Sequence, residues 1–130
     1  MTEQTVDLRK GKRIFFEVTD NIEGAAVVAE MFDQAIPIKF LNLSEGGISF
    51  QAERSICQRI SWDQVITIKV AQTGLLAFLD NIKVEVKYVL DYDMVAHVTF
   101  GCQFIEPKKI VLNEIKKIID ARLKPMANQS

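Results

Sequence analysis

The 130-residue sequence contains one histidine, His97, and two cysteines, Cys57 and Cys102. No HxH, HExxH or CxxH pattern accompanies the histidine, so neither a metal site nor a histidine-based acid–base site is indicated. The cysteines form no CxxC pair, and we expect two half-buried thiols in a reducing compartment. Phosphate loops of the GxGxxG or GxxxxGKS/T type are missing too. These absences argue against a hydrolase or transferase, and we expect a protein that is not an enzyme.

The chain also lacks an excess of charge of one sign and a long apolar run. Its 16 Lys and Arg residues stand against 17 Asp and Glu residues, giving a net charge of −1. Wrapping a duplex needs a broad basic surface, so we expect no DNA binding. No apolar run approaches the roughly 18 residues of a membrane span. The N-terminal residues have neither the basic nor the apolar region of a secretory signal. We therefore expect a cytoplasmic protein without membrane insertion.

The composition is that of an ordinary folded globule. Hydrophobic residues make up 48% of the chain and charged residues 25%, which argues against a disordered chain. A length of 130 residues suits one domain and leaves little room for a second. We therefore predict a single domain over residues 1–130.

Alternation of apolar and polar residues dominates the middle of the chain and predicts β-strands. A long strand is predicted over 82–92, with its even positions on the buried face, and it pairs as a hairpin with a strand over 96–104. Shorter runs of the same period occupy 14–18, 36–40, 48–50 and 66–70. The stretch 24–32 fits either a strand or a helical turn. Trp62 is expected to pack near a strand start, and His97 to face solvent.

The period changes in the last third of the chain. After Pro107, which suits the first turn of a helix, the residues Val111, Ile115, Ile118, Ile119 and Arg122 share one stripe. This spacing predicts an amphipathic helix of about four turns. About six or seven short antiparallel strands followed by one helix predict a small β-barrel, with the helix over one opening. The stripe also suits a partner protein, but an exposed apolar stripe invites aggregation, so we favour packing on the barrel.

Two short segments carry the candidate chemistry. The first, residues 9–13, places four cations in five residues, with Arg9 and Arg13 at its ends and a glycine between them. Such a run is commonly a solvated face. Two arginines can, however, turn toward one object, and arginine binds phosphate or a guanine edge with two hydrogen bonds and stacks on a base.

The second segment, residues 41–50, is a connection between two predicted strands that contains Asn42, Ser44, Gly46 and Gly47. These residue types are also typical of an ordinary turn, where Asn and Ser bond the backbone and glycine supplies positive φ.

Taken together, Arg9-x-x-x-Arg13 and Asn42-x-Ser44-x-x-Gly47 resemble the two-part signature of PilZ domains, which are bacterial receptors for the second messenger cyclic di-GMP. The run 101–105 resembles the closing strand of that family. The resemblance implies a mainly β fold, namely a six-stranded antiparallel PilZ-like β-barrel over about residues 8–105. A C-terminal α-helix would follow at about 107–123.

Position by position, the resemblance implies a ligand-binding set. Arg9 and Arg13 would grip guanine and phosphate, and Asn42 would read the guanine edge. Ser44 would supply a small hydroxyl, and Gly47 a position without a side chain. A neutral amide at 42 accepts hydrogen bonds less strongly than the carboxylate that also occurs there in the family, so affinity could be lower.

The function that follows is a receptor or adaptor whose ligand is cyclic di-GMP, with no other cofactor and no metal. Binding would order the N-terminal arginine arm, and the signal would pass through an unidentified effector protein. The alternative is a PilZ-like interaction module for motility or secretion that does not bind the nucleotide.

Overall fold

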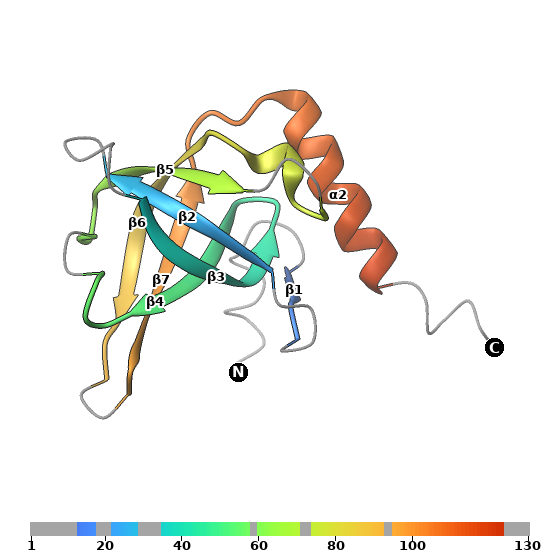
Figure 1. Cartoon of the computed structure of the whole chain (residues 1–130). Helices are drawn as coiled ribbons and strands as arrows, with labels where there is room; N and C mark the ends of the chain where they lie inside the picture. The colour runs from blue at the N-terminus through green and yellow to red at the C-terminus, as the bar shows by residue number, and fades with distance from the viewer. Residues whose placement is uncertain are drawn as a thin grey trace, which may run out of the picture.

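The computed structural model describes residues 13–17, 22–28, 35–57, 60–70, 74–92 and 95–123. It is mainly β, with a short 3-10 helix, η3, and one α-helix, α2 (Figure 1). The elements are β1 (Arg13–Phe15), β2 (Glu23–Val28), β3 (Ala35–Ser44), β4 (Gly47–Glu53), β5 (Val65–Val70), η3 (Ala77–Leu79), β6 (Ile82–Leu90), β7 (His97–Phe104) and α2 (Lys109–Leu123).

All strand pairs are antiparallel, and they close into a barrel. The strand order is β1-β3-β2-β5-β6-β7-β4, and a further pairing between β3 and β4 joins the two ends of the six-stranded part. β1 is an additional short strand on the C-terminal half of β3. Closure leaves those six strands paired on both sides, which removes edges that would otherwise pair with other chains. The predicted mainly β barrel with a C-terminal helix is therefore confirmed.

The barrel interior is filled by aliphatic and aromatic side chains from alternate strand positions. Phe40, Phe50 and Phe100 are fully buried, and the rings of Phe50 and Phe100 stack with centroids 5.4 Å apart. The alternation predicted for the strand over 96–104 is confirmed along β7, where Val98, Phe100, Cys102 and Phe104 are buried. The ambiguous stretch 24–32 is a strand, β2, over the part of it that the structure describes.

A β-bulge in β3 decides which side chains reach the outer surface. Phe40 pairs with Phe50, but the next pair is Asn42 with Ser49, so Leu41 is an extra residue on β3. A bulge of this kind shifts the alternation by one. Even positions before Leu41 point into the barrel, whereas Asn42 after it lies on the outer face and Leu43 is buried instead.

A second bulge corrects the prediction for the strand over 82–92. Val86 pairs with Cys102 and Tyr88 with Gly101, which makes Lys87 an extra residue on β6. Val84 and Val86 are buried as predicted. Tyr88 and the later even positions Leu90 and Tyr92 are exposed, so the predicted burial of even positions is wrong beyond the bulge.

Trp62 was predicted to pack near a strand start, but its side chain is 66% exposed.

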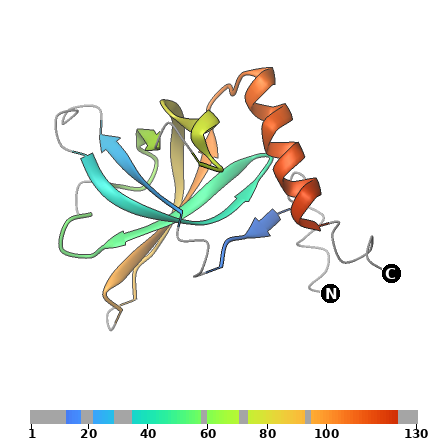
Figure 2. The ribbon, with the colours of Figure 1, turned by 45° about the vertical axis from the view of Figure 1, so that its right-hand side comes forward.

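α2 packs beside the barrel along β1, β3 and η3 (Figure 2). Ile115 and Ile119 on its inner face are buried in the same hydrophobic core as the strands. The guanidinium of Arg122 lies 5.5 Å from the centroid of the Phe16 ring on the β1 side. Helix α2 begins at Lys109, two residues later than Pro107, and the positive φ of 42° at Glu106 marks the turn that precedes it.

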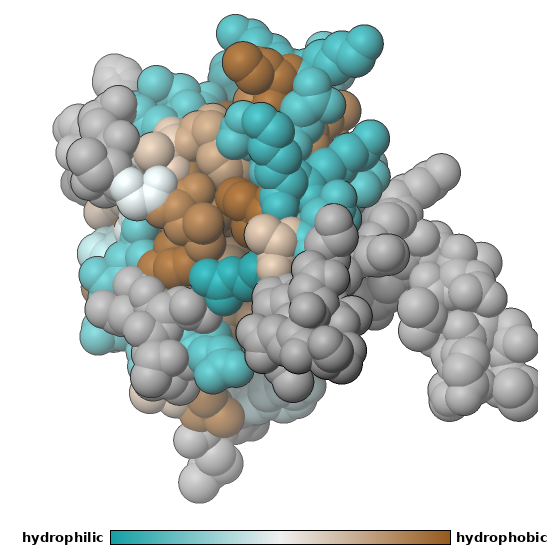
Figure 3. All heavy atoms as spheres, turned by 90° about the vertical axis from the view of Figure 1, so that its right-hand side faces the viewer, coloured by the Kyte–Doolittle hydropathy of each residue, from teal (hydrophilic) through white to brown (hydrophobic). Residues whose placement is uncertain are grey.

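The outer surface of the helix side is mixed in character. Seen from the side on which α2 lies in Figure 1, a hydrophobic patch is surrounded by hydrophilic residues (Figure 3). Among the described helices, none is long and apolar enough to cross a bilayer.

Because Ile115 is buried between α2 and the barrel, we expect Ile115→Ala to lower the free energy of unfolding by about 2–5 kcal/mol, the usual cost of emptying a core site. Ile110 on the same helix is 68% exposed, so Ile110→Ala should change stability by no more than about 0.5 kcal/mol. Urea denaturation of the two variants measures both effects. Equal midpoints for the two would mean that α2 does not depend on its contact with the barrel.

Candidate functional site

The turn between β3 and β4 is shorter than predicted and holds two of the candidate residues. β3 runs through Ser44 and β4 begins at Gly47, so the loop itself is only Glu45 and Gly46. The Gly47 N–H donates to the Ser44 hydroxyl oxygen at 3.2 Å, and that hydroxyl lies 3.4 Å from the Gly47 carbonyl oxygen that it can donate to. Ser44 therefore stabilises the turn, as an ordinary turn serine would.

Gly47 is needed for space rather than for its backbone angles. A Cβ at this position would lie 2.0 Å from the carbonyl oxygen of Cys102 on β7. β4 and β7 could not keep their pairing, which joins Gly47 to Gln103, with a side chain there. The close approach of the two backbones is therefore possible only with glycine.

Arg13 joins the first motif to the second. β1 pairs with the end of β3, with Arg13 opposite Ser44 and Phe15 opposite Asn42. The Arg13 guanidinium donates a hydrogen bond from Nη1 to the Asn42 side-chain oxygen at 2.6 Å. Asn42 is only 8% exposed, so this bond satisfies a buried acceptor. Residues that lie 29 positions apart in the sequence thus meet on the outer face of the barrel.

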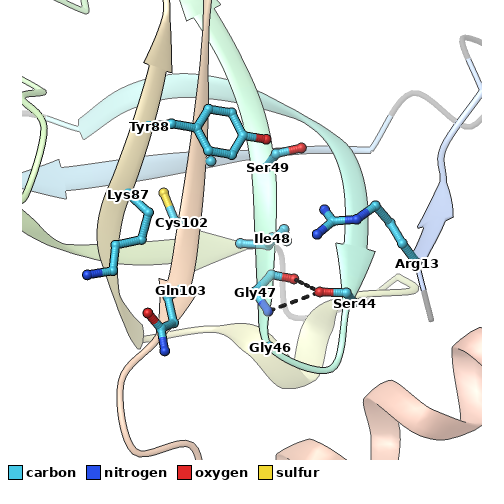
Figure 4. Close-up of a pocket in the computed structure, with 11 residues that line it drawn as sticks. Arg13, Ser44, Gly46, Gly47, Ile48, Ser49, Lys87, Tyr88, Cys102 and Gln103 are labelled. Carbon is cyan, nitrogen blue, oxygen red and sulfur yellow. Dashed lines mark hydrogen bonds between the residues drawn. The ribbon is translucent and has the colours of Figure 1, made fainter. Parts of the chain in front are cut away.

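Arg13, Ser44 and Gly47 border a cavity of about 250 Å³ on the surface of β4, β6 and β7. Arg13 and Tyr88 reach toward β4 from opposite sides of it (Figure 4). Its lining consists of Arg13, Ser44, Gly46, Gly47, Ile48, Ser49, Lys87, Tyr88, Gly101, Cys102 and Gln103.

The charges at this cavity have one sign. Arg13 and Lys87 are the charged lining residues within the described part of the chain, and no carboxylate lines the cavity there. Lys87 is also 3.5 Å from the carboxylate of Glu85, an exposed ion pair of small energy. A concave surface with cationic rims attracts anions such as phosphate.

Tyr88 and Gly101 form one wall of the cavity together. They are cross-strand partners on β6 and β7, and a Cβ on Gly101 would lie 1.9 Å from the Tyr88 ring. The ring therefore covers the glycine, an arrangement that fills the gap that a glycine leaves in a sheet. Tyr88 was predicted to face inward, because the alternation of residue types does not reveal the bulge at Lys87. Ser49 and Gly101 face outward as the alternation of their own strands predicts, but they carry no ligand-binding signal in the sequence.

Four of the five candidate ligand-binding residues are brought together in this way: Arg13, Asn42, Ser44 and Gly47. The fifth, Arg9, lies outside the described residues. His97 is on β7 but lines a different cavity, and no group of three or more His, Cys, Asp or Glu side chains suited to a metal occurs among the described residues.

A larger cavity of about 530 Å³ lies between η3, the start of β6 and the start of α2. Phe78, Ile82 and Val111 contribute apolar surface to it. Its charged lining residues are of both signs, namely Lys83, Lys108, Asp80 and Glu106. None of the candidate ligand-binding residues that the structure describes lines this cavity. Size alone therefore does not select a candidate site, and the cavity lined by the motif residues is the candidate considered below.

Both cysteine thiols are buried, and the pKa of each is raised, which makes the thiol less reactive. Burial raises the pKa of Cys102 from 9.0 to about 12. Burial also raises the pKa of Cys57, against a smaller opposing effect of a backbone hydrogen bond. A thiol with a raised pKa carries little thiolate at neutral pH, and the thiolate is the reactive form.

The chain is similar to known proteins in structure but not in sequence. No protein-family model and no curated protein matches the sequence. The PilZ domain of YcgR from Escherichia coli, solved with c-di-GMP, matches with a TM-score of 0.70 at 12% identity, covering 94% of this chain and 98% of that chain. The c-di-GMP complex of MrkH from K. pneumonia matches with a TM-score of 0.65 at 17% identity. The Bacillus subtilis inhibitor of motility MotI/DgrA matches with a TM-score of 0.61 at 13% identity.

The chain has a PilZ-like fold, as the sequence resemblance predicted. The match to MrkH includes 92% of this chain, and the match to MotI/DgrA includes 90% of it. It spans about half of those longer chains, 55% and 52%, and 48% of the longer YcgR chain. Identities this low show the fold, and the function of this chain has to be argued from its own site.

The raised pKa of Cys102 predicts a loss of stability at alkaline pH. Below pH 9 the thiol is protonated in both the folded and the unfolded chain, so it adds no pH dependence. Between pH 9 and about 12 the unfolded chain releases this proton and the folded chain keeps it. Stability should then fall with rising pH, by up to about 1.4 kcal/mol per pH unit from this residue.

Chemical denaturation at pH 8 and pH 10.5 measures this effect. The Cys102→Ala variant is the control, and it should lose less stability over the same interval than the unchanged protein. An identical loss in both proteins would show that the Cys102 thiol does not titrate differently in the folded chain.

Proposed function

We propose that this chain is a receptor for cyclic di-GMP that acts as a single domain and passes the signal to a partner protein. The observation that carries the proposal is the hydrogen bond between Arg13 and Asn42 beside the cavity. It joins the arginine motif to the Asn-x-Ser motif at a single place on the barrel surface. A barrel that used these residues only for a turn would have no need of an arginine from β1.

The chemistry of the ligand matches that of the site. Cyclic di-GMP carries two phosphodiester charges and two guanine bases. A guanidinium forms two parallel hydrogen bonds with a phosphate and stacks on a purine, so Arg13 and Arg9 can engage both features. Lys87 adds a second cation to the rim in the described part of the chain.

The size of the cavity indicates which part of the ligand enters it. Pockets that enclose a whole drug-sized ligand measure about 300–1,000 Å³, whereas this cavity measures about 250 Å³. It therefore suits one planar base, with the sugar-phosphate ring outside near Arg13. The Asn42 carboxamide, on the adjacent strand, can hydrogen-bond a base edge because its oxygen has two lone pairs and its nitrogen two donors.

Arg9 lies four positions before Arg13 in the sequence. Four residues span at most about 14 Å, so Arg9 can reach a ligand that Arg13 already holds. We propose that the ligand draws Arg9 in and thereby orders the segment between the two arginines. That segment would then present a partner protein with a surface that the free chain does not have.

The alternative is an interaction module that does not bind the nucleotide. The observation that favours it is the exposed apolar tip of the β6–β7 hairpin, where Leu90, Tyr92 and Val95 are exposed. Arg54 holds this tip in place, since its guanidinium donates to the Val95 carbonyl oxygen at 2.8 Å and pairs with Asp91. Exposed apolar side chains that lie beside such contacts suit binding to another protein whether or not a nucleotide is bound.

Isothermal titration calorimetry with cyclic di-GMP distinguishes the two functions. We expect the unchanged protein to bind with a Kd of roughly 1 μM, about −8 kcal/mol. Arg13→Ala and Arg9→Ala should each weaken binding at least ten-fold, because a hydrogen bond to a charged group contributes about 1.5–3 kcal/mol.

The control variant is Lys116→Ala, which removes an exposed cation from α2 and should leave the affinity unchanged. Cyclic di-AMP serves as the control ligand for recognition of guanine. Absence of binding by the unchanged protein would reject the receptor function and favour the interaction module. Binding that survives both arginine substitutions would place the ligand elsewhere.

A further inference from the structure

A row of outward-facing residues crosses the candidate site from strand to strand. Asn42 on β3 pairs with Ser49 on β4, and Ser49 pairs with Gly101 on β7. Directly opposed residues of antiparallel strands have Cβ atoms about 4.5–5.5 Å apart on the same face. A carboxamide and a hydroxyl can bridge that separation with one hydrogen bond.

Ser49 is the unusual member of this row. Its side chain is 1% exposed, and its hydroxyl has no hydrogen-bond partner among the residues that the structure describes. A buried hydroxyl without a partner is unfavourable, and each case in a folded protein needs an explanation. Because Ser49 lines the cavity next to Asn42 and Arg13, the explanation is to be sought in the function of the site.

The Arg13–Asn42 hydrogen bond indicates a role for the Ser49 hydroxyl. Arg13 donates to the Asn42 oxygen in the free chain. A phosphate is a stronger acceptor for a guanidinium than a neutral amide is, so a bound phosphodiester competes for Arg13. Once Arg13 turns to the phosphate, the Asn42 oxygen is a buried acceptor that has lost this donor.

We propose that Ser49 is a positioning residue. When the ligand binds, the Ser49 hydroxyl replaces Arg13 as the hydrogen-bond donor to the Asn42 oxygen. This inference rests on the proposed function. In the exchange, the Arg13–Asn42 bond breaks, Arg13 bonds the phosphate, and the Ser49 hydroxyl donates to the Asn42 oxygen. No proton leaves any group, since Ser49 only shares its hydroxyl hydrogen. The Asn42 carboxamide is thereby held with its nitrogen directed away from Ser49 and toward the base.

The exchange gives Ser49→Ala an unusual combination of effects. The substitution removes no hydrogen bond from the described part of the free chain, so the melting temperature should be unchanged or higher. Affinity for cyclic di-GMP should fall about three- to ten-fold, the loss of one neutral hydrogen bond. Ser55→Ala, at an exposed serine of the turn after β4, is the matched control and should alter neither quantity.

A double-mutant cycle in calorimetry tests whether Ser49 acts through Asn42. We expect Asn42→Ala alone to weaken binding about ten-fold, and the double variant Asn42→Ala/Ser49→Ala to bind no worse than Asn42→Ala. If the two effects multiply instead, Ser49 acts independently and the exchange is wrong. An unchanged affinity of Ser49→Ala, or a lower melting temperature, would also overturn it.

These outcomes are separate from the fate of the proposed function. If the unchanged protein does not bind cyclic di-GMP, the receptor function fails, and the exchange, which rests on it, fails with it. If the protein binds and Arg13→Ala weakens binding while Ser49→Ala does not, the receptor function stands and the role of Ser49 alone is rejected.

Discussion

The C-terminal half of β3 is held between β1 and β4, and the extra residue Leu41 determines which face its side chains occupy. Without that bulge, Asn42 would continue the inward alternation of Ile38 and Phe40, and a carboxamide would be buried in an apolar core at a cost of several kcal/mol. With it, Leu43 fills the core and Asn42 meets Arg13. Barrel closure and the candidate site therefore depend on the same few residues of one strand.

Most of the fold could be predicted from the sequence because buried positions recur at a regular spacing of apolar residues along the strands and the helix. The strands around Phe40, Phe50 and Phe100 and the helix containing Ile115 all follow it. This spacing does not reveal a β-bulge, because an extra residue such as Lys87 looks like any other polar position in the sequence. The inward placement of the strand beyond Val86 was wrong for this reason alone.

The candidate site likewise contains residues that could be predicted from the sequence and one that could not. Arg13, Asn42, Ser44 and Gly47 were predicted from a resemblance in motif, and the structure adds a physical reason for their proximity in the pairing of β1 with β3. Ser49 carried no motif signal. The role proposed for it depends on its burial and on the lack of a hydrogen-bond partner among the described residues, and neither property can be read from residue types or spacing.

The two bulges have a consequence for how this chain could change during evolution. Most substitutions on an exposed strand position alter one side chain, but deletion of Leu41 or Lys87 would exchange core and surface along the rest of the strand. The register of each strand therefore requires an extra residue at these two places, whatever its side chain does. Insertions and deletions should be tolerated in the loops and rejected at these two places, so chain length within β3 and β6 should persist while their sequences diverge.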